Sequence, residues 1–226
     1  PHLARDIACH PDQHRIAGAV TECVVDVLEL VQIEEQEREP GFAGLARLVC
    51  GQQLSTASAS AIWGRLTAAF DPFDPEPIRK ARAQRLGRLG LSAAKIKTLK
   101  NIARELAAER LNLDVLAEED ADAAHHTLTA LHGIGPWTAD VYLLFCLGHG
   151  DAWPAGDIAI QEAIKVGLAL KTRPTPKQMA PLAEPWRPLR GAAAHLWWSY
   201  YRVLKKREGV LADKINPAIS PGLRAR

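Results

Sequence analysis

The chain of 226 residues contains few cysteines, a single methionine and no long apolar run. Its four cysteines lie far apart and form no CxxC pair: Cys9, Cys23, Cys50 and Cys146. This spacing excludes a zinc ribbon and a cysteine-ligated iron–sulfur cluster, and it is typical of a protein from a reducing cytosol. Charged residues interrupt every apolar stretch before the ~18 residues that a membrane span requires. The N-terminus shows no charged-then-apolar signal layout, and since the only methionine is Met179, we do not expect Pro1 to be the initiator. We therefore expect a cytoplasmic chain without a membrane partner.

Positive charge is unevenly distributed, although the formal net charge is only +2. Residues 1–40 contain three arginines and nine acidic residues, which gives a net charge of −6. In contrast, residues 78–110 carry a net charge of +8 and residues 171–226 carry +9. Two basic segments in a nearly neutral chain favour a one-sided positive surface that binds phosphates. Runs of charge are also common on solvated helix faces, so this pattern alone leaves both interpretations open.

The sequence predicts an almost entirely helical protein. Alanine and leucine are plentiful, both favour helices, and no alternating strand pattern is present. The first expected helix covers residues 16–33, and a second begins at Phe42 and ends at a turn at 51–55. The remaining expected helices are 55–70, 77–87, 92–109, 120–130, 136–148, 158–170, 177–183 and 187–207. The tail at 213–226 is expected to be irregular.

A short turn at residues 131–135, LHGIG, joins two of these helices. Gly133 and Gly135 permit positive φ and leave the backbone bare, while Pro136 suits the first position of a helix. The amides of Gly133, Gly135, Trp137 and Thr138 would then point outward at a helix N-terminus, where anions bind. A turn of this kind is also an ordinary corner between helices, so the context must decide.

Four motifs occur here in the order found in one family. Residues 131–140 match the helix-hairpin-helix pattern LxGIGxxTA, and the loop WPAGD at 153–157 ends in a Gly-Asp pair about twenty residues later. Upstream, GQQLS at 51–55 is similar to a QQxS segment, and 186–198 is similar to a WxPxR…LW ending. Together they cover roughly residues 42–205. The chain thus resembles the helix-hairpin-helix–GPD superfamily of DNA glycosylases, and best the 3-methyladenine DNA glycosylase II class (AlkA type).

The resemblance implies an all-α, two-lobed helical bundle with the helix-hairpin-helix motif at the mouth of a cleft. We expect residues 42–150, with the hairpin at 129–140, to form a central lobe. Residues 1–41 together with 151–226 would form the second lobe of the same single unit. Fuller members of the class carry an additional N-terminal α/β domain, which we expect this chain to lack.

Asp157 is the predicted catalytic residue. Cleavage of the bond between a base and C1′ of deoxyribose builds positive charge on the sugar. A carboxylate beside C1′ stabilises that charge, or it orients and deprotonates an attacking water. Asp157 also stands directly before a predicted helix, where aspartate is a good N-cap, and both roles can hold together.

The resemblance places Trp137 and Trp198 at aromatic positions of the base pocket. A base methylated at a ring nitrogen is cationic, leaves readily and stacks well on electron-rich rings, so no general acid is needed. Core packing is the alternative role of these two residues. Val141 and Ile158 stand where the family often has further aromatic residues, so the pocket is expected to be leaner or differently shaped.

Trp137 also indicates the subclass. Bifunctional relatives have a lysine there, whose amine attacks the sugar and leads to strand cleavage. Tryptophan cannot perform this reaction, and the cysteine cluster C-x6-C-x2-C-x5-C of endonuclease III-like members is missing. We therefore expect a monofunctional glycosylase without lyase activity and without an iron–sulfur cluster.

Gln53 is the residue expected to fill the gap that an extruded base leaves, with Leu54 beside it. A base in a duplex must be flipped out before an enzyme can act on it. Phosphates of the same strand would be held by Gly133, Ile134, Gly135, Trp137 and Thr138. The alternative for Gln52 and Gln53 is that they only cap the preceding helix.

Metal sites are expected to be few. Family members hold a monovalent cation, Na⁺ or K⁺, through backbone carbonyls that correspond to Thr129, Leu131 and Ile134. The cluster Cys9, His10 and His14 is not expected to bind zinc, because a structural site needs four ligands. His125 and His126 are expected to face solvent. No other cofactor is implied.

The predicted function is hydrolytic removal of alkylated bases, of the 3-methyladenine and 7-methylguanine type, from duplex DNA during base excision repair. The protein would act as a monomer in the cytoplasm, at the bacterial nucleoid. Three alternatives remain open: a glycosylase of the same superfamily for other damaged or mismatched bases, a non-catalytic helix-hairpin-helix DNA-binding module, and a helical interaction protein without DNA affinity.

Overall fold

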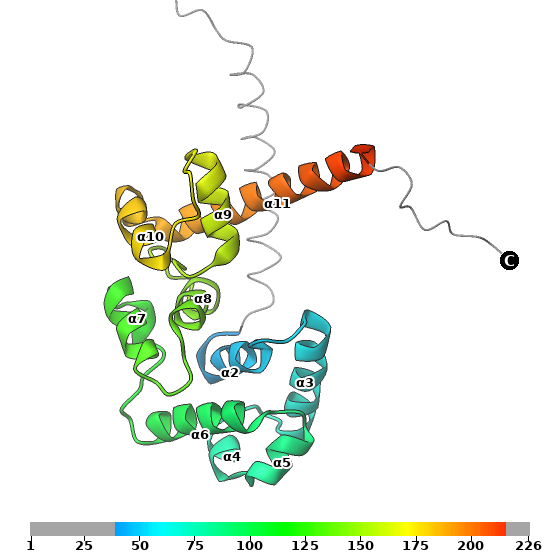
Figure 1. Cartoon of the computed structure of the whole chain (residues 1–226). Coiled ribbons are helices and arrows are strands. Elements are labelled where there is room, and N and C mark those ends of the chain that lie inside the picture. Colours follow the sequence, from blue (N-terminus) through cyan, green and yellow to red (C-terminus); the bar gives the residue numbers. More distant parts are fainter. Residues whose placement is uncertain (1–38, 216–226) are drawn as a thin grey trace, which may run out of the picture.

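The computed structural model describes residues 39–215, with side chains up to residue 205. Every regular element in this range is helical, so the prediction of an all-α fold is confirmed (Figure 1). The elements are α2 (Gly41–Gly51), α3 (Thr56–Ala69), α4 (Pro75–Lys80), α5 (Ala83–Arg88), α6 (Ala93–Ala107), η1 (Val115–Ala117), α7 (Ala121–Thr129), α8 (Pro136–Cys146), α9 (Ile158–Gly167), α10 (Pro176–Ala183), η2 (Glu184–Trp186) and α11 (Arg190–Ile215). The expected helix at 16–33, the cluster Cys9, His10 and His14, and the tail from residue 216 lie outside the described residues. None of the described helices is long and apolar enough to cross a membrane.

One expected helix, 77–87, is wrong: it is two short helices, α4 and α5. The chain is extended at Ala81 and Arg82, where ψ is 141° and 138°. Pro75 occupies the first turn of α4 and starts it earlier than expected, because proline is well suited to that position. The bend allows both Ile78 and Leu86 to be fully buried. Apolar periodicity alone did not show this break.

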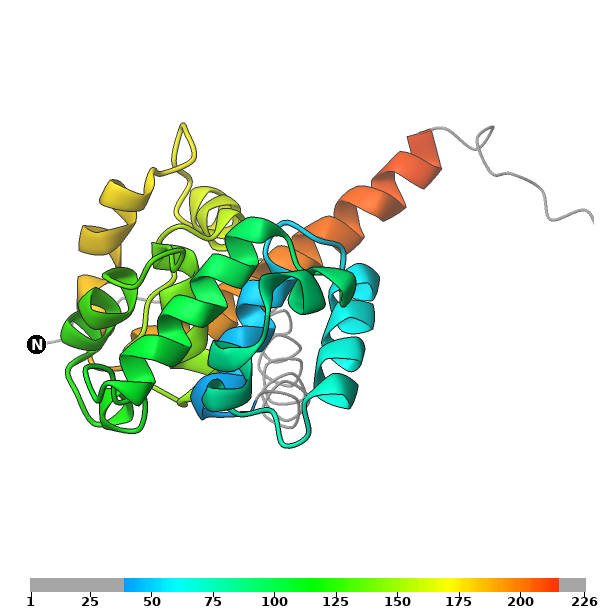
Figure 2. The same cartoon turned by 90° about the horizontal axis from the view of Figure 1, so that it is seen from below.

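Two groups of helices surround the core (Figures 1 and 2). Helix α2 packs on α3, α6 and α8, and its Leu45 and Val49 are completely buried. Helix α9 packs on α11, which also contacts η2. The division into a lobe at 42–150 and a lobe formed by 1–41 with 151–226 stays a prediction.

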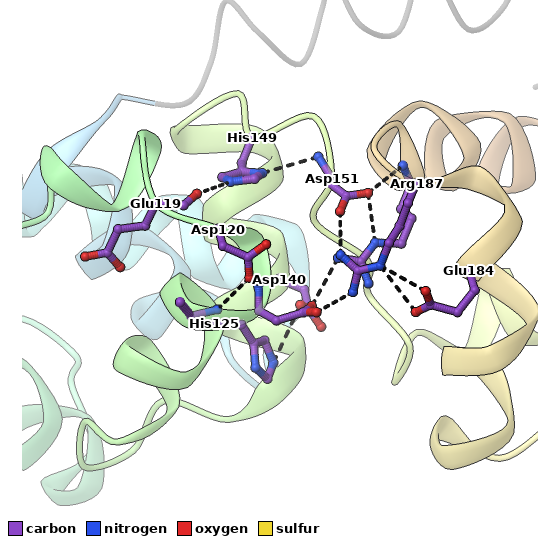
Figure 3. A network of polar contacts seen from close by, with 11 residues as sticks. Glu119, Asp120, His125, Asp140, His149, Asp151, Glu184 and Arg187 are labelled. Atoms are coloured by element: carbon purple, nitrogen blue, oxygen red, sulfur yellow. Dashed lines mark hydrogen bonds and ion pairs between the residues drawn. The ribbon is translucent and has the colours of Figure 1, made fainter.

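Four charged residues connect the two groups (Figure 3). Asp151, in the loop before α9, accepts hydrogen bonds from Arg190 Nε and Arg187 Nη1, each at 2.9 Å. Both arginines also bind Asp122 of α7, from Arg190 Nη2 at 3.0 Å and from Arg187. Partial burial raises the pKa of Asp122, but the hydrogen bonds from the arginines outweigh it and hold this pKa below its usual range. The network therefore fixes the loop that leads to Asp157 against both α7 and α11.

Asp140 of α8 has a buried carboxyl, 6% exposed, which lies 3.6 Å from His125 Nε2. His125 is half-buried rather than solvent-facing as expected, whereas His126 is exposed. Burial, together with the negative charge of Asp122, raises the pKa of Asp140 from 3.8 to about 8, against the opposing effect of Arg190. The folded protein therefore holds this proton at neutral pH.

We expect the substitution Asp140→Asn to flatten the dependence of stability on pH. Because the pKa is higher in the folded state, the stabilisation from the neutral carboxyl is complete below about pH 4 and disappears as the pH rises through about 8. At pH 8.5 the free energy of unfolding of the variant should exceed that of the native protein by at least about 1 kcal/mol, since a shift of one pKa unit corresponds to about 1.4 kcal/mol. Burial lowers the pKa of His125 and gives an opposite slope, but His125 is present in both proteins. Urea denaturation between pH 5 and 8.5 measures the difference, and an unchanged slope would contradict this assignment.

Candidate active site

The turn between α7 and α8 has the geometry of an anion site. Gly133 has a φ of +83°, and Gly135 is the N-cap of α8, with Pro136 as its first residue. Within residues 39–215, the amides of Gly133 and Gly135 donate to no backbone or side-chain acceptor. Ile134, in contrast, donates to the carbonyl of Leu131 at 3.1 Å, which closes the turn, and its side chain is buried. The two glycine amides are therefore left without a partner among the described residues, and their binding of a phosphate stays a prediction.

Helix α6 supports this turn from behind. Asn101 accepts a hydrogen bond from the amide of His132 at 3.3 Å. A Cβ atom on Gly133 would lie 1.9 Å from Oγ1 of the buried Thr98, whereas one on Gly135 would meet nothing within 4 Å. Gly133 is thus required by packing within the protein, and Gly135 leaves open space on the outer side of the turn.

The side chain of Asp157 accepts three hydrogen bonds. Its Oδ1 binds the amide of Ile160 at 3.0 Å and thereby caps α9, and it also accepts from Trp198 Nε1 at 3.0 Å. Its Oδ2 accepts from Trp137 Nε1 at 2.9 Å. The cap that was an alternative role for Asp157 is present, and it orients the carboxylate toward the two tryptophans. The structure therefore brings together the predicted catalytic residue and both predicted pocket aromatics, from three different elements.

The two tryptophans differ in their surroundings. Trp137 remains 43% exposed at the start of α8. Trp198 is half-buried and packs near Phe145, with ring centroids 5.4 Å apart, and near His195 at 5.8 Å. Phe145 was missed by the sequence analysis, although its place two turns after Trp137 on the same helix was a usable signal. It adds an aromatic ring to the wall behind Trp198.

The other two predicted pocket residues lie in opposite environments. Val141 is only 3% exposed, so little of its side chain is available to a ligand, while Ile158 is 61% exposed beside Asp157. Their contact with a base stays a prediction.

Gln53 and Leu54 lie in the loop 51–55, which we call the wedge loop. Both are exposed, and Gln53 has a φ of +57°, an uncommon conformation for a residue other than glycine. Gln53, Leu54 and Trp137 line one groove of about 480 Å³ between α2, α3 and the start of α8. Because Trp137 also binds Asp157, the predicted wedge and the predicted catalytic residue are both neighbours of this one indole ring.

Of the two basic segments, residues 78–110 form α4, α5 and α6. Part of this charge is neutralised locally, since Arg79 and Lys80 both pair with Glu76. Arg82, Arg88 and Lys97 remain exposed. Among the described residues, no group of three or more histidine, cysteine, aspartate or glutamate side chains could hold a metal ion.

The comparisons with known proteins agree with this geometry. A family model described as "HhH-GPD superfamily base excision DNA repair protein" matches residues 46–188. The chain is 32% identical to DNA-3-methyladenine glycosylase 1 of Schizosaccharomyces pombe, over 72% of this chain and 73% of that protein. It is 36% identical to the probable bifunctional transcriptional activator/DNA repair enzyme AlkA of Mycobacterium tuberculosis, over 67% of this chain and 32% of the relative.

Solved structures show the same similarity. The structure of the S. pombe 3-methyladenine DNA glycosylase in complex with abasic DNA matches with a TM-score of 0.61 at 30% identity, over 71% of this chain and 82% of that one. A DNA-3-methyladenine glycosidase from Bacillus halodurans matches with a TM-score of 0.67 at 26% identity, over 78% and 85% of the two chains. The chain belongs to the HhH-GPD superfamily of base excision DNA repair proteins.

Proposed function

We propose that this protein is a monofunctional DNA glycosylase that hydrolyses the bond between deoxyribose and an alkylated base in duplex DNA. The observation that carries the proposal is the Asp157 carboxylate, held by two indole N–H groups beside an outward-facing glycine turn. Relatives named as 3-methyladenine glycosylases, one of them solved with abasic DNA, support this substrate class. We propose that the protein acts as a monomer.

The reaction follows from the positions of these groups. The amides of the turn at 131–135 would hold a backbone phosphate, and the wedge loop would enter the stack as the base leaves it. Positive charge then develops at C1′. Asp157 Oδ1 already accepts two hydrogen bonds and Oδ2 accepts one, so Oδ2 has a lone pair left for C1′ or for the attacking water. Asp157 would lower the barrier by stabilising this charge.

The same hydrogen bonds favour bases that are already cationic. The indole N–H groups of Trp137 and Trp198 both donate to Asp157, so neither is left to donate to a leaving base. A neutral base would depart as a poorly stabilised anion, whereas a base methylated at N3 or N7 departs neutral. The ring faces of the two tryptophans add cation–π attraction for such a base.

Trp137 supplies no amine, and the reaction would therefore stop at the abasic site. A monovalent cation would be held by the carbonyl oxygens of Thr129, Leu131 and Ile134. These are hard oxygen donors of the kind that alkali cations accept, and the carbonyl of Leu131 keeps a second lone pair beside its bond to Ile134. Such an ion would add positive charge where a phosphate approaches.

A panel of duplexes, each with a single modified base, tests the proposal. We expect excision of 3-methyladenine and 7-methylguanine, and strand cleavage only after heat or alkali, because the product is an abasic site. Hypoxanthine and mismatched thymine should be excised at least about 100-fold more slowly, since these uncharged bases would have to leave as anions. Efficient removal of a neutral base would instead support a glycosylase for other lesions. Binding without excision of any base would support the non-catalytic module.

A further inference from the structure

The wedge loop is held in a conformation that its own sequence does not favour. Gln53, at a φ of +57°, has a left-handed backbone, which is strained for a residue other than glycine. Such residues persist where the surrounding structure determines their conformation. Within the loop, only the bond from the Leu54 amide to the Gly51 carbonyl, at 3.2 Å, connects the residues on either side of Gln53. Other parts of the protein must therefore hold the loop in place.

Gln52 makes the connection between the wedge loop and the hairpin. Its Nε2 donates to the carbonyl of Gly133 at 3.3 Å and to Oγ1 of Thr138 at 3.1 Å. One of these acceptors lies within the turn at 131–135, and the other lies in the first turn of α8. A primary amide has two N–H donors, so both are occupied and neither is left for a DNA base. The sequence analysis gave Gln52 no role other than capping α2.

Lys95 holds the residue that directly precedes the loop. Its Nζ donates to the carbonyl of Cys50, the residue two positions before Gln52, at 2.7 Å. The wedge loop is thus tied to α6 on one side and to the hairpin on the other. Since α6 also supports the hairpin through Thr98 and Asn101, the phosphate site and the wedge are parts of one braced unit.

We propose that Gln52 is a positioning residue that couples the phosphate-binding hairpin to the wedge loop and thereby drives extrusion of the base. The proposal rests on the glycosylase function proposed above. Extrusion costs a few kcal/mol, and a wedge can oppose this cost only if its loop does not yield when it enters the stack. Without the Gln52 hydrogen bonds, the hairpin would still bind the phosphate, but the wedge loop would yield when Gln53 enters the stack.

The test compares Gln52→Ala with the native protein on two duplexes that carry 7-methylguanine opposite cytosine or opposite thymine. Extrusion is easier from the mispair, so a defect in extrusion must be larger for the paired lesion. We expect single-turnover excision opposite cytosine to fall at least tenfold and excision opposite thymine to fall less than threefold. The affinity for undamaged duplex and the melting temperature should stay unchanged. The matched variant Gln52→Glu keeps the length but removes the donors, so its excision rates on the two duplexes should show the same contrast as those of Gln52→Ala, whereas its negative charge beside the hairpin should also weaken binding to DNA.

A second measurement is independent of bond cleavage. 2-Aminopurine placed directly beside the lesion becomes brighter as stacking is lost, and the brightening at saturating protein should be smaller for Gln52→Ala. The role of Gln52 would be overturned if Gln52→Ala slowed excision by the same factor on both duplexes. It would also be overturned if the variant changed neither the two excision rates nor the fluorescence of 2-aminopurine. If the native protein brightens the probe but excises no base, the glycosylase proposal fails while the coupling is still measured.

Discussion

Replacement of Asp157 by asparagine should lower the single-turnover rate of excision by about 10³-fold or more, because the negative charge beside C1′ is lost. An amide of the same shape still caps α9 if its oxygen takes the position of Oδ1, which binds the Ile160 amide and Trp198 Nε1. Its Nδ2 would then face Trp137 Nε1, donor against donor, where the carboxylate now accepts at 2.9 Å. We expect the affinity for undamaged duplex, measured by fluorescence anisotropy, to change less than threefold.

Two further variants separate the charge of Asp157 from the orientation of its neighbours. Trp137→Phe and Trp198→Phe keep an aromatic ring and remove one N–H donor each. They should lower the rate about tenfold, since each loses one hydrogen bond to a charged group, worth about 1.5–3 kcal/mol. If Trp137→Phe were as inactive as Asp157→Asn, displacement of the indole rather than loss of charge would explain the defect. Turnover retained within tenfold by Asp157→Asn would remove this residue from its proposed role.

The parts of the site that could be predicted are those encoded by local backbone chemistry. A glycine that needs positive φ, a proline that starts α8 and an aspartate that caps α9 each act within a few residues of their own position. Helix α6 could also be placed from local signals. Its buried Ile96, Leu99 and Ile102 follow the helical repeat, and Ser92 caps its start.

Contacts between distant segments could not be predicted. Trp198 lies 41 positions from Asp157, and Gln52 lies 81 positions from Gly133, so no local pattern links them. The sequence suggested that Trp198 was either core or pocket, whereas the structure gives its ring to the packing with Phe145 and its N–H to Asp157. An amphipathic side chain can do both, and only the arrangement of α8, α9 and α11 shows it.

The network of Asp122, Asp151, Arg187 and Arg190 illustrates the same limit. Both arginines belong to a motif that was recognised, but the sequence gave no reason for their presence. Their bonds to Asp151 explain it, because they fix the loop that carries Asp157 to its place beside Trp137. The break between α4 and α5 is a smaller example, since it depends on how two short helices fit against α6.

Alanine at the two glycines of the hairpin is expected to have different effects: Gly133→Ala should lower stability, and Gly135→Ala should lower the affinity for DNA. Gly133→Ala would place a methyl group 1.9 Å from Thr98 Oγ1 at a φ of +83°, so it must push the turn away from α6. Backbone strain of about 1–2 kcal/mol and overpacking of about 1–3 kcal/mol should lower the free energy of unfolding by roughly 2–5 kcal/mol. Addition of Thr98→Ala, which removes the clashing oxygen, should restore part of this stability in urea denaturation.

Gly135→Ala should cost no more than about 1 kcal/mol of stability, the usual penalty for alanine in place of glycine at an N-cap, because nothing lies within 4 Å of the added methyl group and φ is −89°. Its methyl group would project from the N-cap of α8, beside the free amides, where a phosphate must approach. We therefore expect the affinity for DNA to fall about tenfold, equally for damaged and undamaged duplexes, since a phosphate contact carries no information about the base. Anisotropy titrations on both duplexes at one salt concentration measure this. A native affinity in Gly135→Ala would show that DNA does not contact this side of the turn, whereas a loss confined to damaged DNA would place the methyl group in the base pocket instead.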